Sequence, residues 1–214
     1  IRDRSPSCGL GDVYKRQQQM IKDQASAWVR EQAPVSTFRA MRDQDLAQGF
    51  FSETWQAMIE MGWTGLVVPE TYGGAGLGYQ TLGLVLEQLG RNLVASPLYA
   101  SSVVGAAALM HSGSEDQKQA LLPKIADGGR LVVLALEEGP RHNPSQIKCR
   151  AKLTSSGVTL SGTKQFVMEG NAATDFVVAA NVDHGAGEQG VGLFLVACDT
   201  PGVRRHAVKT MDSR

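Results

Sequence analysis

The stretch "DGGRLVVLAL", Asp127 to Leu136, decides the fold class, because the hydrophobic period of the chain changes within it. Upstream of Gly129 the apolar residues recur at helical spacing. Leu131 to Leu136, in contrast, is a continuous apolar run of the length expected for a buried strand. Helices first and strands second indicate an α+β fold. We therefore predict a domain boundary near Gly128 to Arg130.

Residues 17–129 are predicted to form an all-α N-terminal domain. Leu82, Val85 and Leu89 fall at positions i, i+3 and i+7, which places them on one face of a helix. The segment Pro97 to Ser112 contains no Asp, Glu, Lys or Arg. Such a segment is typical of one helix buried at the centre of a bundle.

The last predicted helix of this domain has a recognisable start. Ser114 and Gln117 have the spacing of a capping box, in which each side chain bonds the backbone N–H of the other residue. Pro123 follows six residues later and has no N–H to donate. We expect Pro123 to interrupt the helix.

Residues 130–214 are predicted to form a small antiparallel β barrel or sandwich domain, incomplete at its end. Short apolar or alternating segments are separated by Gly, Asn and Asp turns, a pattern typical of such folds. Asp183 to Gly190 is expected to be a hairpin tip. After Leu131 to Leu136, the predicted strands are Ile147 to Leu153, Val158 to Leu160, Phe166 to Met168, Phe176 to Ala180 and Leu193 to Cys198.

Both ends of the chain are unusual. The first sixteen residues, "IRDRSPSCGLGDVYKR", show neither helical nor strand periodicity and contain no apolar core of a signal peptide. We interpret residues 1–16 as a non-native, adapter-derived segment. The other end, "HAVKTMDSR", stops in mid-pattern. We therefore expect the chain to be a fragment of a longer protein.

The composition excludes several classes of function. The chain of 214 residues carries 21 acidic and 21 basic side chains, so electrostatic binding of nucleic acid is not expected. Cys8, Cys149 and Cys198 form no CxxC pair, which suits a reducing compartment, and we expect cytoplasmic localisation. The four histidines lack metal-ligand spacing, so no metal site is predicted. No apolar run reaches the roughly 18 residues that a membrane span needs.

Three segments carry possible chemistry, and each also has an ordinary structural interpretation. "VVPETYGGAGLG", Val67 to Gly78, is either a ligand-side loop or a plain helix turn rich in glycine. "LALEEGPRHNP", Leu134 to Pro144, is either a strand end lining a pocket or a solvated loop. "KQFVMEG", Lys164 to Gly170, is either a core strand or an apolar platform against a flat ring. Lys164 is not a P-loop lysine, because the required glycines and the following helix are missing.

In combination, three segments resemble the acyl-CoA dehydrogenase family. Residues 62–91, "GWTGLVVPETYGGAGLGYQTLGLVLEQLGR", match the family pattern G-x-x-G-x-x-x-P-E-x-Y-G-G-x-G. Residues 113–128 and 160–180 match two further family patterns in the right order. The resemblance implies an N-terminal helical domain and a middle β domain. It also implies a C-terminal four-helix domain, which we expect to be missing here.

The resemblance also implies a function. The chain is expected to belong to a FAD-dependent oxidoreductase of fatty acid metabolism. Such an enzyme removes an α-proton and a β-hydride from an acyl-CoA thioester and leaves a trans-2-enoyl-CoA. An electron-transfer flavoprotein is the implied acceptor. In most of the family the catalytic base lies in the C-terminal domain, so no catalytic residue is assigned here and the fragment alone is expected to be inactive.

Five residues are implied as cofactor contacts. Phe166 matches the aromatic residue that lies against the isoalloxazine ring of FAD, and Val167 follows it as in the family. Met168 stands where the family usually has a Thr or Ser that donates a hydrogen bond near the flavin, which methionine cannot do. Leu136 and Glu137 match the strand end at the cofactor, where Glu137 replaces a hydroxyl residue.

Two further residues are implied as substrate contacts, and Glu138 keeps the acidic residue of the family pattern. Asn143 falls on a position usually occupied by a serine near the substrate or the cofactor. Arg141 is expected to meet a phosphate or a substrate carboxylate.

The departures at Glu137 and Met168 leave alternatives open. They resemble divergent family members that work beside a second, more regular subunit, so a homo- or hetero-oligomer is expected. The main alternative to an active dehydrogenase subunit is a non-catalytic partner chain. A flavin monooxygenase or oxidase on the same fold is the weaker alternative.

Overall fold

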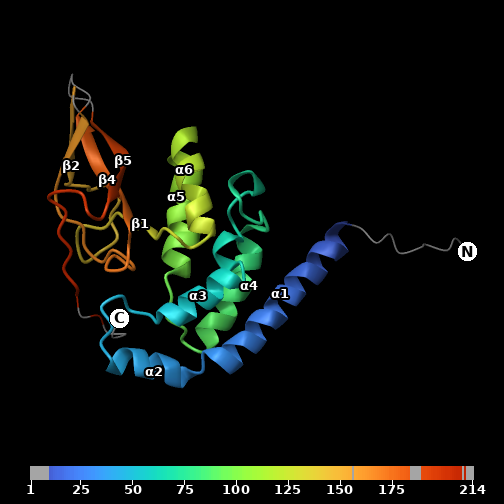
Figure 1. Ribbon diagram of the computed structural model, residues 1–214. Helices are drawn as coiled ribbons and strands as arrows, with labels where there is room; N and C mark the ends of the chain where they lie inside the picture. The colour runs from blue at the N-terminus through green and yellow to red at the C-terminus, as the bar shows by residue number, and fades with distance from the viewer. Residues whose placement is uncertain (1–9, 156, 184–188, 209, 211–214) are drawn as a thin grey trace, which may run out of the picture.

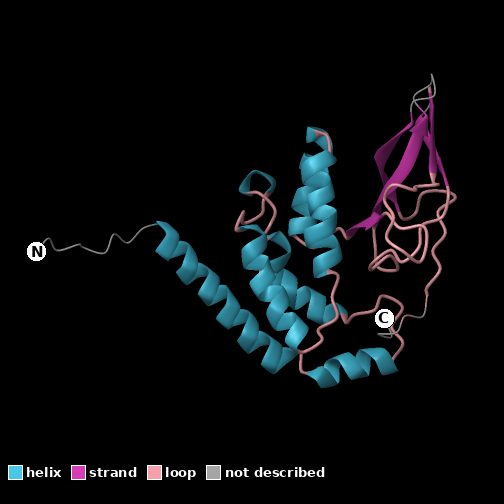
Figure 2. Ribbon diagram, turned by 180° about the vertical axis from the view of Figure 1, so that it is seen from behind, coloured by secondary structure: helices cyan, strands magenta, loops and turns pink. Residues whose placement is uncertain are grey.

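The protein is described by a computed structural model covering residues 10–155, 157–183, 189–208 and 210. Helices come first and strands second, and Figure 2 shows the helices gathered on one side of the molecule and the strands on the other. The α+β class is therefore confirmed. The predicted hairpin tip, Asp183 to Gly190, lies mostly outside the described residues.

The helical part is a bundle with short connections (Figure 1). Two single 3₁₀ turns, η1 (Trp63–Gly65) and η2 (Glu70–Tyr72), lie in the connection between α3 (Ser52–Glu60) and α4 (Gly78–Arg91). The other helices in the described part of the chain are α1 (Leu10–Gln32), α2 (Val35–Asp43), α3 (Ser52–Glu60), α4 (Gly78–Arg91), η3 (Leu98–Gly105), α5 (Ala106–Ser112) and α6 (Glu115–Ala126).

The core of the bundle forms where α1 meets α4. Val29 of α1 and Leu82 and Val85 of α4 are almost completely buried in one cluster, as their helical spacing predicts. Trp28 meets Trp63 edge-on, with ring centroids 5.2 Å apart. Helix α1 begins at Leu10, so residues 10–16, which the sequence analysis set aside, continue the first helix.

Helix α6 confirms its predicted start and contradicts its predicted interruption. Ser114 and Gln117 form both hydrogen bonds of the capping box. The helix nevertheless continues through Pro123 to Ala126. Pro123 lies in the last turn, where its missing N–H removes one helical hydrogen bond. Burial of the neighbouring Leu122 and Ile125 offsets that loss.

The segment predicted as one helix from Pro97 to Ser112 has two parts. The first, η3, is a π-helix, and α5 continues it. A π-helix is wider than an α-helix and is often found at functional sites. Its Ser101 hydroxyl accepts a hydrogen bond from the N–H of Val132 at 3.1 Å, so the widened turn is joined to the first strand.

The β part is one five-stranded mixed sheet. The antiparallel prediction holds for β2 with β3 and for β4 with β5, but β4 pairs in parallel with both β1 and β2. Long connections between strands made this possible, because parallel pairing needs a crossover. The strands are β1 (Val132–Ala135), β2 (Arg150–Thr154), β3 (Gly157–Ser161), β4 (Asp175–Asp183) and β5 (Gln189–Ala197).

Strand β4 organises the sheet. Its Asp175–Val178 segment pairs with β1, its Asn181–Val182 segment pairs with β2, and β5 pairs along its whole length. Since β5 takes the other edge, β1 and β2 share one edge of β4 end to end. The chain between them, residues 136–149, therefore leaves the sheet and returns to it.

The predicted strand Phe166 to Met168 is wrong. Residues 162–174 form a loop without strand pairing. Phe166 and Glu169 have φ values of 51° and 55°, a left-handed conformation that cannot continue a strand. The apolar side chains that suggested a strand are therefore carried by a strained loop.

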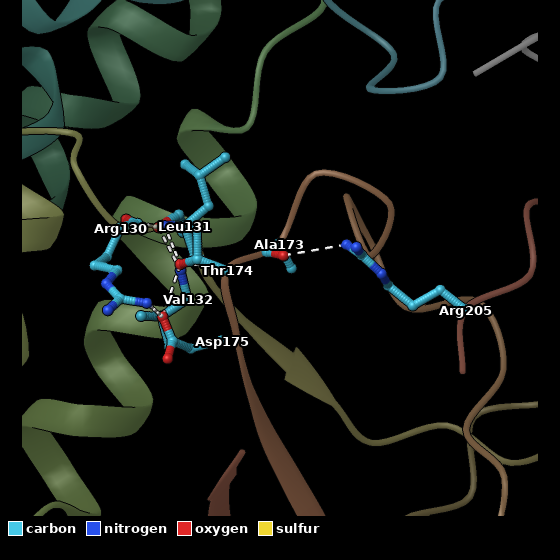
Figure 3. A network of polar contacts seen from close by, with 8 residues as sticks. Arg130, Leu131, Val132, Ala173, Thr174, Asp175 and Arg205 are labelled. Atoms are coloured by element: carbon cyan, nitrogen blue, oxygen red, sulfur yellow. Dashed lines mark hydrogen bonds and ion pairs between the residues drawn. The ribbon is translucent and has the colours of Figure 1, made fainter. Parts of the chain in front are cut away.

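A polar network joins the last helix to the sheet (Figure 3). The Thr174 hydroxyl accepts a hydrogen bond from the N–H of Leu131 at 3.0 Å. The Arg130 guanidinium lies 3.3 Å from the Asp175 carboxylate, which is largely buried. Arg205 donates to the carbonyl of Ala173 from the end of the described chain. These contacts fix where the helical part ends and β1 begins.

Gly105 sits where η3 meets β1. A Cβ added to Gly105 lies 1.9 Å from the carbonyl oxygen of Val132, which is far inside contact distance. We expect Gly105→Ala to lower the free energy of unfolding by about 3 kcal/mol, because the helix must move off the strand. Urea denaturation measures the change.

Gly83→Ala is the matched control. Gly83 is an exposed interior residue of α4, and an added Cβ meets no atom within 4 Å. This change should raise stability by about 0.5 to 1 kcal/mol through helix propensity. Equal effects of the two substitutions contradict the close contact between η3 and β1.

Candidate functional site

Two segments that are distant in the sequence meet at the end of β1. The N–H of Gln165 donates to the carbonyl of Glu137 at 2.8 Å. The Lys164 ammonium donates to the carbonyl of Leu136 at 3.0 Å and to the Glu138 carboxylate at 2.6 Å. The candidate cofactor residues of the strand end and those of the following loop are therefore held in one place.

Glu138 and Lys164 form a buried ion pair. Their side chains are 10% and 9% exposed, and the Glu138 carboxylate also accepts from the N–H groups of Lys148 and Cys149 at 2.5 and 2.9 Å. Burial alone raises the pKa of Glu138, but the hydrogen bonds from Lys164, Lys148 and Cys149 lower that pKa below its ordinary value overall. Glu138 thus stays ionised and closes the loop 139–147 at its base.

Glu137 has a different partner from Glu138. Its carboxylate contacts the Nδ1 atom of His142 at 2.5 Å. The Glu137 side chain is 26% exposed, whereas His142 is 70% exposed. The Glu137 carboxylate thus has a polar partner at the strand end, on an imidazole that water reaches.

The loop after Lys164 presents apolar side chains to solvent. Phe166 is 60% exposed and Met168 is 52% exposed, while Val167 between them packs against the cluster that contains Val133 and Phe176. A left-handed non-glycine residue costs about 1 to 3 kcal/mol and is frequently found at ligand sites. The strained backbone at Phe166 thus holds an exposed aromatic ring on an anchored loop.

Arg141 and Asn143 lie on the loop that Glu138 closes. The side-chain Oδ1 of Asn143 accepts a hydrogen bond from the Ser145 hydroxyl at 2.7 Å. The backbone carbonyl of Asn143 accepts another from the N–H of Gln146. Arg141 is exposed and forms no hydrogen bond or ion pair with other described residues. The structure places both residues beside the strand end, but it shows no contact between them and Phe166, Val167 or Met168.

An open cavity of about 460 Å³ lies between the helices and the sheet. It is mostly aliphatic, and Leu136 joins it to the candidate cofactor segment. Its lining residues are Tyr79, Val103, Val104, Ala107, Ala108, His111, Leu134, Leu136 and Leu193.

Two parts of this site were not predicted from the sequence. One is the ion pair of Lys164 with Glu138, although these are opposite charges beside two apolar segments. The other is the position of Tyr79 and His111 in the cavity lining. The i, i+4, i+8 spacing of Val103, Ala107 and His111 was a usable signal, since it places the three on one helical face.

The family follows from a comparison with known proteins. Residues 15–129 match the model of the acyl-CoA dehydrogenase N-terminal domain, which is more than half of the chain. The chain belongs to the acyl-CoA dehydrogenase family. Members of this family are flavoprotein oxidoreductases.

Individual relatives agree with this assignment. Acyl-CoA dehydrogenase FadE27 from Mycobacterium tuberculosis is 35% identical over 82% of this chain and 45% of its own length. The solved ChsE4-ChsE5 complex from the same organism is 30% identical with a TM-score of 0.79, over 90% of this chain and 50% of that one. Glutaryl-CoA dehydrogenase from Mycobacterium smegmatis, solved with FADH2, is 26% identical with a TM-score of 0.76, over 87% of this chain and 47% of that one. This chain spans about half the length of these relatives.

Two further observations apply to the described residues alone. None of their helices combines the length and hydrophobicity needed to cross a membrane. No group of three or more His, Cys, Asp or Glu side chains among them is arranged to hold a metal ion.

Glu138→Gln tests the buried ion pair. We expect the variant to lose about 3 kcal/mol of unfolding free energy at neutral pH, because Lys164 stays buried without its counter-charge. The pKa of Glu138 is lowered on folding, so its stabilisation is present above the ordinary Glu pKa of about 4.3 and is lost as the pH falls through the lower folded value. Urea denaturation at a series of pH values measures the gap between the wild type and the variant.

Glu31→Gln is the control, because Glu31 is an exposed residue of α1 without a hydrogen bond or ion pair to other described residues. We expect it to change stability by no more than about 0.5 kcal/mol. The interpretation is wrong if Glu138→Gln costs no more than this control, or if its gap to the wild type stays constant below about pH 4.

Proposed function

We propose that this chain is part of a FAD-dependent acyl-CoA dehydrogenase that converts an acyl-CoA thioester to a trans-2-enoyl-CoA. The observation that carries the proposal is the junction at the end of β1. There the segment Leu136–Glu138 is hydrogen-bonded to the loop that exposes Phe166 and Met168. When bound, FAD supplies the acceptor for the hydride that leaves the β-carbon of the thioester.

The residues present fit a flavin ring. An isoalloxazine is flat and largely apolar on its faces, and Phe166 and Met168 offer an aromatic ring and a polarisable side chain. Val167 anchors their loop in the core. Glu137 lies beside this platform, and its carboxylate contacts the Nδ1 atom of His142. We therefore assign Leu136, Glu137, Phe166, Val167 and Met168 to cofactor binding.

The acyl group is assigned to the aliphatic cavity. Its volume of about 460 Å³ suits a sizeable ligand, since ligand pockets span roughly 300 to 1,000 Å³. Leu136 lines this cavity and also lies beside the proposed flavin platform. The proposed flavin site and the acyl cavity are therefore adjacent. Arg141, which is exposed on the neighbouring loop, is assigned to an anionic part of the substrate, and Asn143 to a polar part.

A non-catalytic partner subunit is the second candidate. Met168 offers no hydrogen bond to a flavin, and Glu137 replaces the hydroxyl residue expected at the strand end. Similarity to the ChsE4-ChsE5 complex supports assembly with a different dehydrogenase subunit. In either case we propose a cytoplasmic homo- or hetero-oligomer, with an electron-transfer flavoprotein as the electron acceptor.

Phe166→Ala tests the flavin platform. We expect the whole gene product to show the absorption bands of bound oxidised flavin and the variant to bind FAD about tenfold more weakly, because an aromatic stacking contact is lost. Titration of the apoprotein with FAD, followed by flavin fluorescence, measures both dissociation constants.

Leu153→Ala is the control, since Leu153 is an apolar residue on β2 with an exposure of 54%, close to the 60% of Phe166. It should leave FAD affinity unchanged. A wild-type protein that stays colourless after FAD addition contradicts the active-enzyme proposal and favours the partner subunit. Equal affinities of Phe166→Ala and wild type contradict the placement of Phe166.

Met168→Thr tests the departure from the family pattern. Threonine adds a hydroxyl donor, and a hydrogen bond of about 1 kcal/mol to the electron-rich reduced ring should raise the two-electron potential by about 20 mV. Spectroelectrochemical titration measures the potential. Met168→Leu is the control, because leucine adds no donor and should leave the flavin potential unchanged. An unchanged potential in the Met168→Thr variant contradicts the position of Met168 at the ring.

A further inference from the structure

The cavity has an aliphatic body and polar side chains at one end. Seven of its lining residues are Val, Ala or Leu. The remaining two, Tyr79 and His111, carry a hydroxyl and an imidazole. Neither side chain forms a hydrogen bond or ion pair with another residue in the part of the chain that the structure describes. The cavity thus offers hydrogen bonds to a ligand.

These two polar residues lie at the same end of the bundle. His111 is in the last turn of α5, eight residues after Val103 of η3. Tyr79 is in the first turn of α4. The loop before α4 reaches the start of α6 through the hydrogen bond between the Tyr72 hydroxyl and Glu115 at 2.9 Å. Tyr79, at the start of α4, and His111, at the end of α5, line the same cavity.

The charges near this end favour a neutral ligand group. The cavity lining contains no Lys or Arg. Glu115 and Asp116 begin α6 four and five residues after His111. The lining thus offers no opposing charge to a carboxylate, whereas a hydroxyl or a ketone is hydrogen-bonded there without adding charge.

We propose that the cavity selects acyl-CoA substrates whose acyl group carries a neutral oxygen, a hydroxyl or a ketone, at the end remote from the thioester. Tyr79 and His111 recognise that oxygen, and the aliphatic lining binds the hydrocarbon between. A plain hydrocarbon chain that reaches these residues desolvates their polar groups without replacing the lost hydrogen bonds, so it binds more weakly. This inference rests on the proposed function of the cavity as the acyl site.

Calorimetric titration of the whole gene product with three probes tests the proposal. The probes are dodecanoyl-CoA, ω-hydroxydodecanoyl-CoA and the ω-carboxylate dodecanedioyl-CoA, with the electron acceptor omitted. We expect the hydroxy probe to bind about tenfold tighter than the other two, as a single well-made hydrogen-bond site allows. Tyr79→Phe and His111→Leu should each reduce this preference while dodecanoyl-CoA affinity is kept or increased.

Tyr99→Phe is the matched control. Tyr99 is 47% exposed, as is Tyr79, but it does not line the cavity. The Tyr99→Phe variant should prefer the hydroxy probe over dodecanoyl-CoA as strongly as the wild type does. Equal wild-type affinities for the hydroxy and the plain probe overturn this inference while the acyl site stands, and so does a preference for the carboxylate. Failure of all three probes to bind overturns the proposed function and, with it, this inference.

Discussion

The structure depends on how closely the π-helix η3 approaches the first strand. At Gly105 there is no space for even a methyl group before the carbonyl oxygen of Val132. The Ser101 hydroxyl bonds the N–H of the same strand residue from the helical side, while β4 pairs with β1 from the sheet side. Strand β1 is therefore held from both directions, which fixes where the chain leaves it at Leu136.

Two consequences follow at the end of β1. Leu134 and Leu136 continue from the fixed strand into the aliphatic cavity against α5. Directly after them, Glu138 pairs with Lys164 and closes a loop, which brings the strained Phe166 segment to the same place. A buried charge pair is weak evidence of stability on its own, but removing one partner is costly. The pair thus helps to fix the relative position of two loops that have no strand pairing of their own.

Several elements were predictable because their signals are local. The capping box of α6 needs only Ser114 and Gln117, and the apolar face of α4 follows from helical spacing. The failures have non-local causes. Phe166 to Met168 has the composition of a strand, but a left-handed residue and a hydrogen bond to Glu137 make it a loop. Pro123 was expected to stop a helix that burial of Leu122 keeps intact.

By itself, the sequence determined the order of helices before strands, the positions of most elements and the resemblance to the family. Periodicity, capping and motif spacing are properties of neighbouring residues. The tertiary structure alone decided the parallel pairings of β4, the partner of Lys164, the pairing of Glu137 with His142 and the meeting of Tyr79 with His111 at one cavity. These contacts join residues whose separation in the chain carries no periodic signal, and packing and charge neutralisation select them only once the chain is folded.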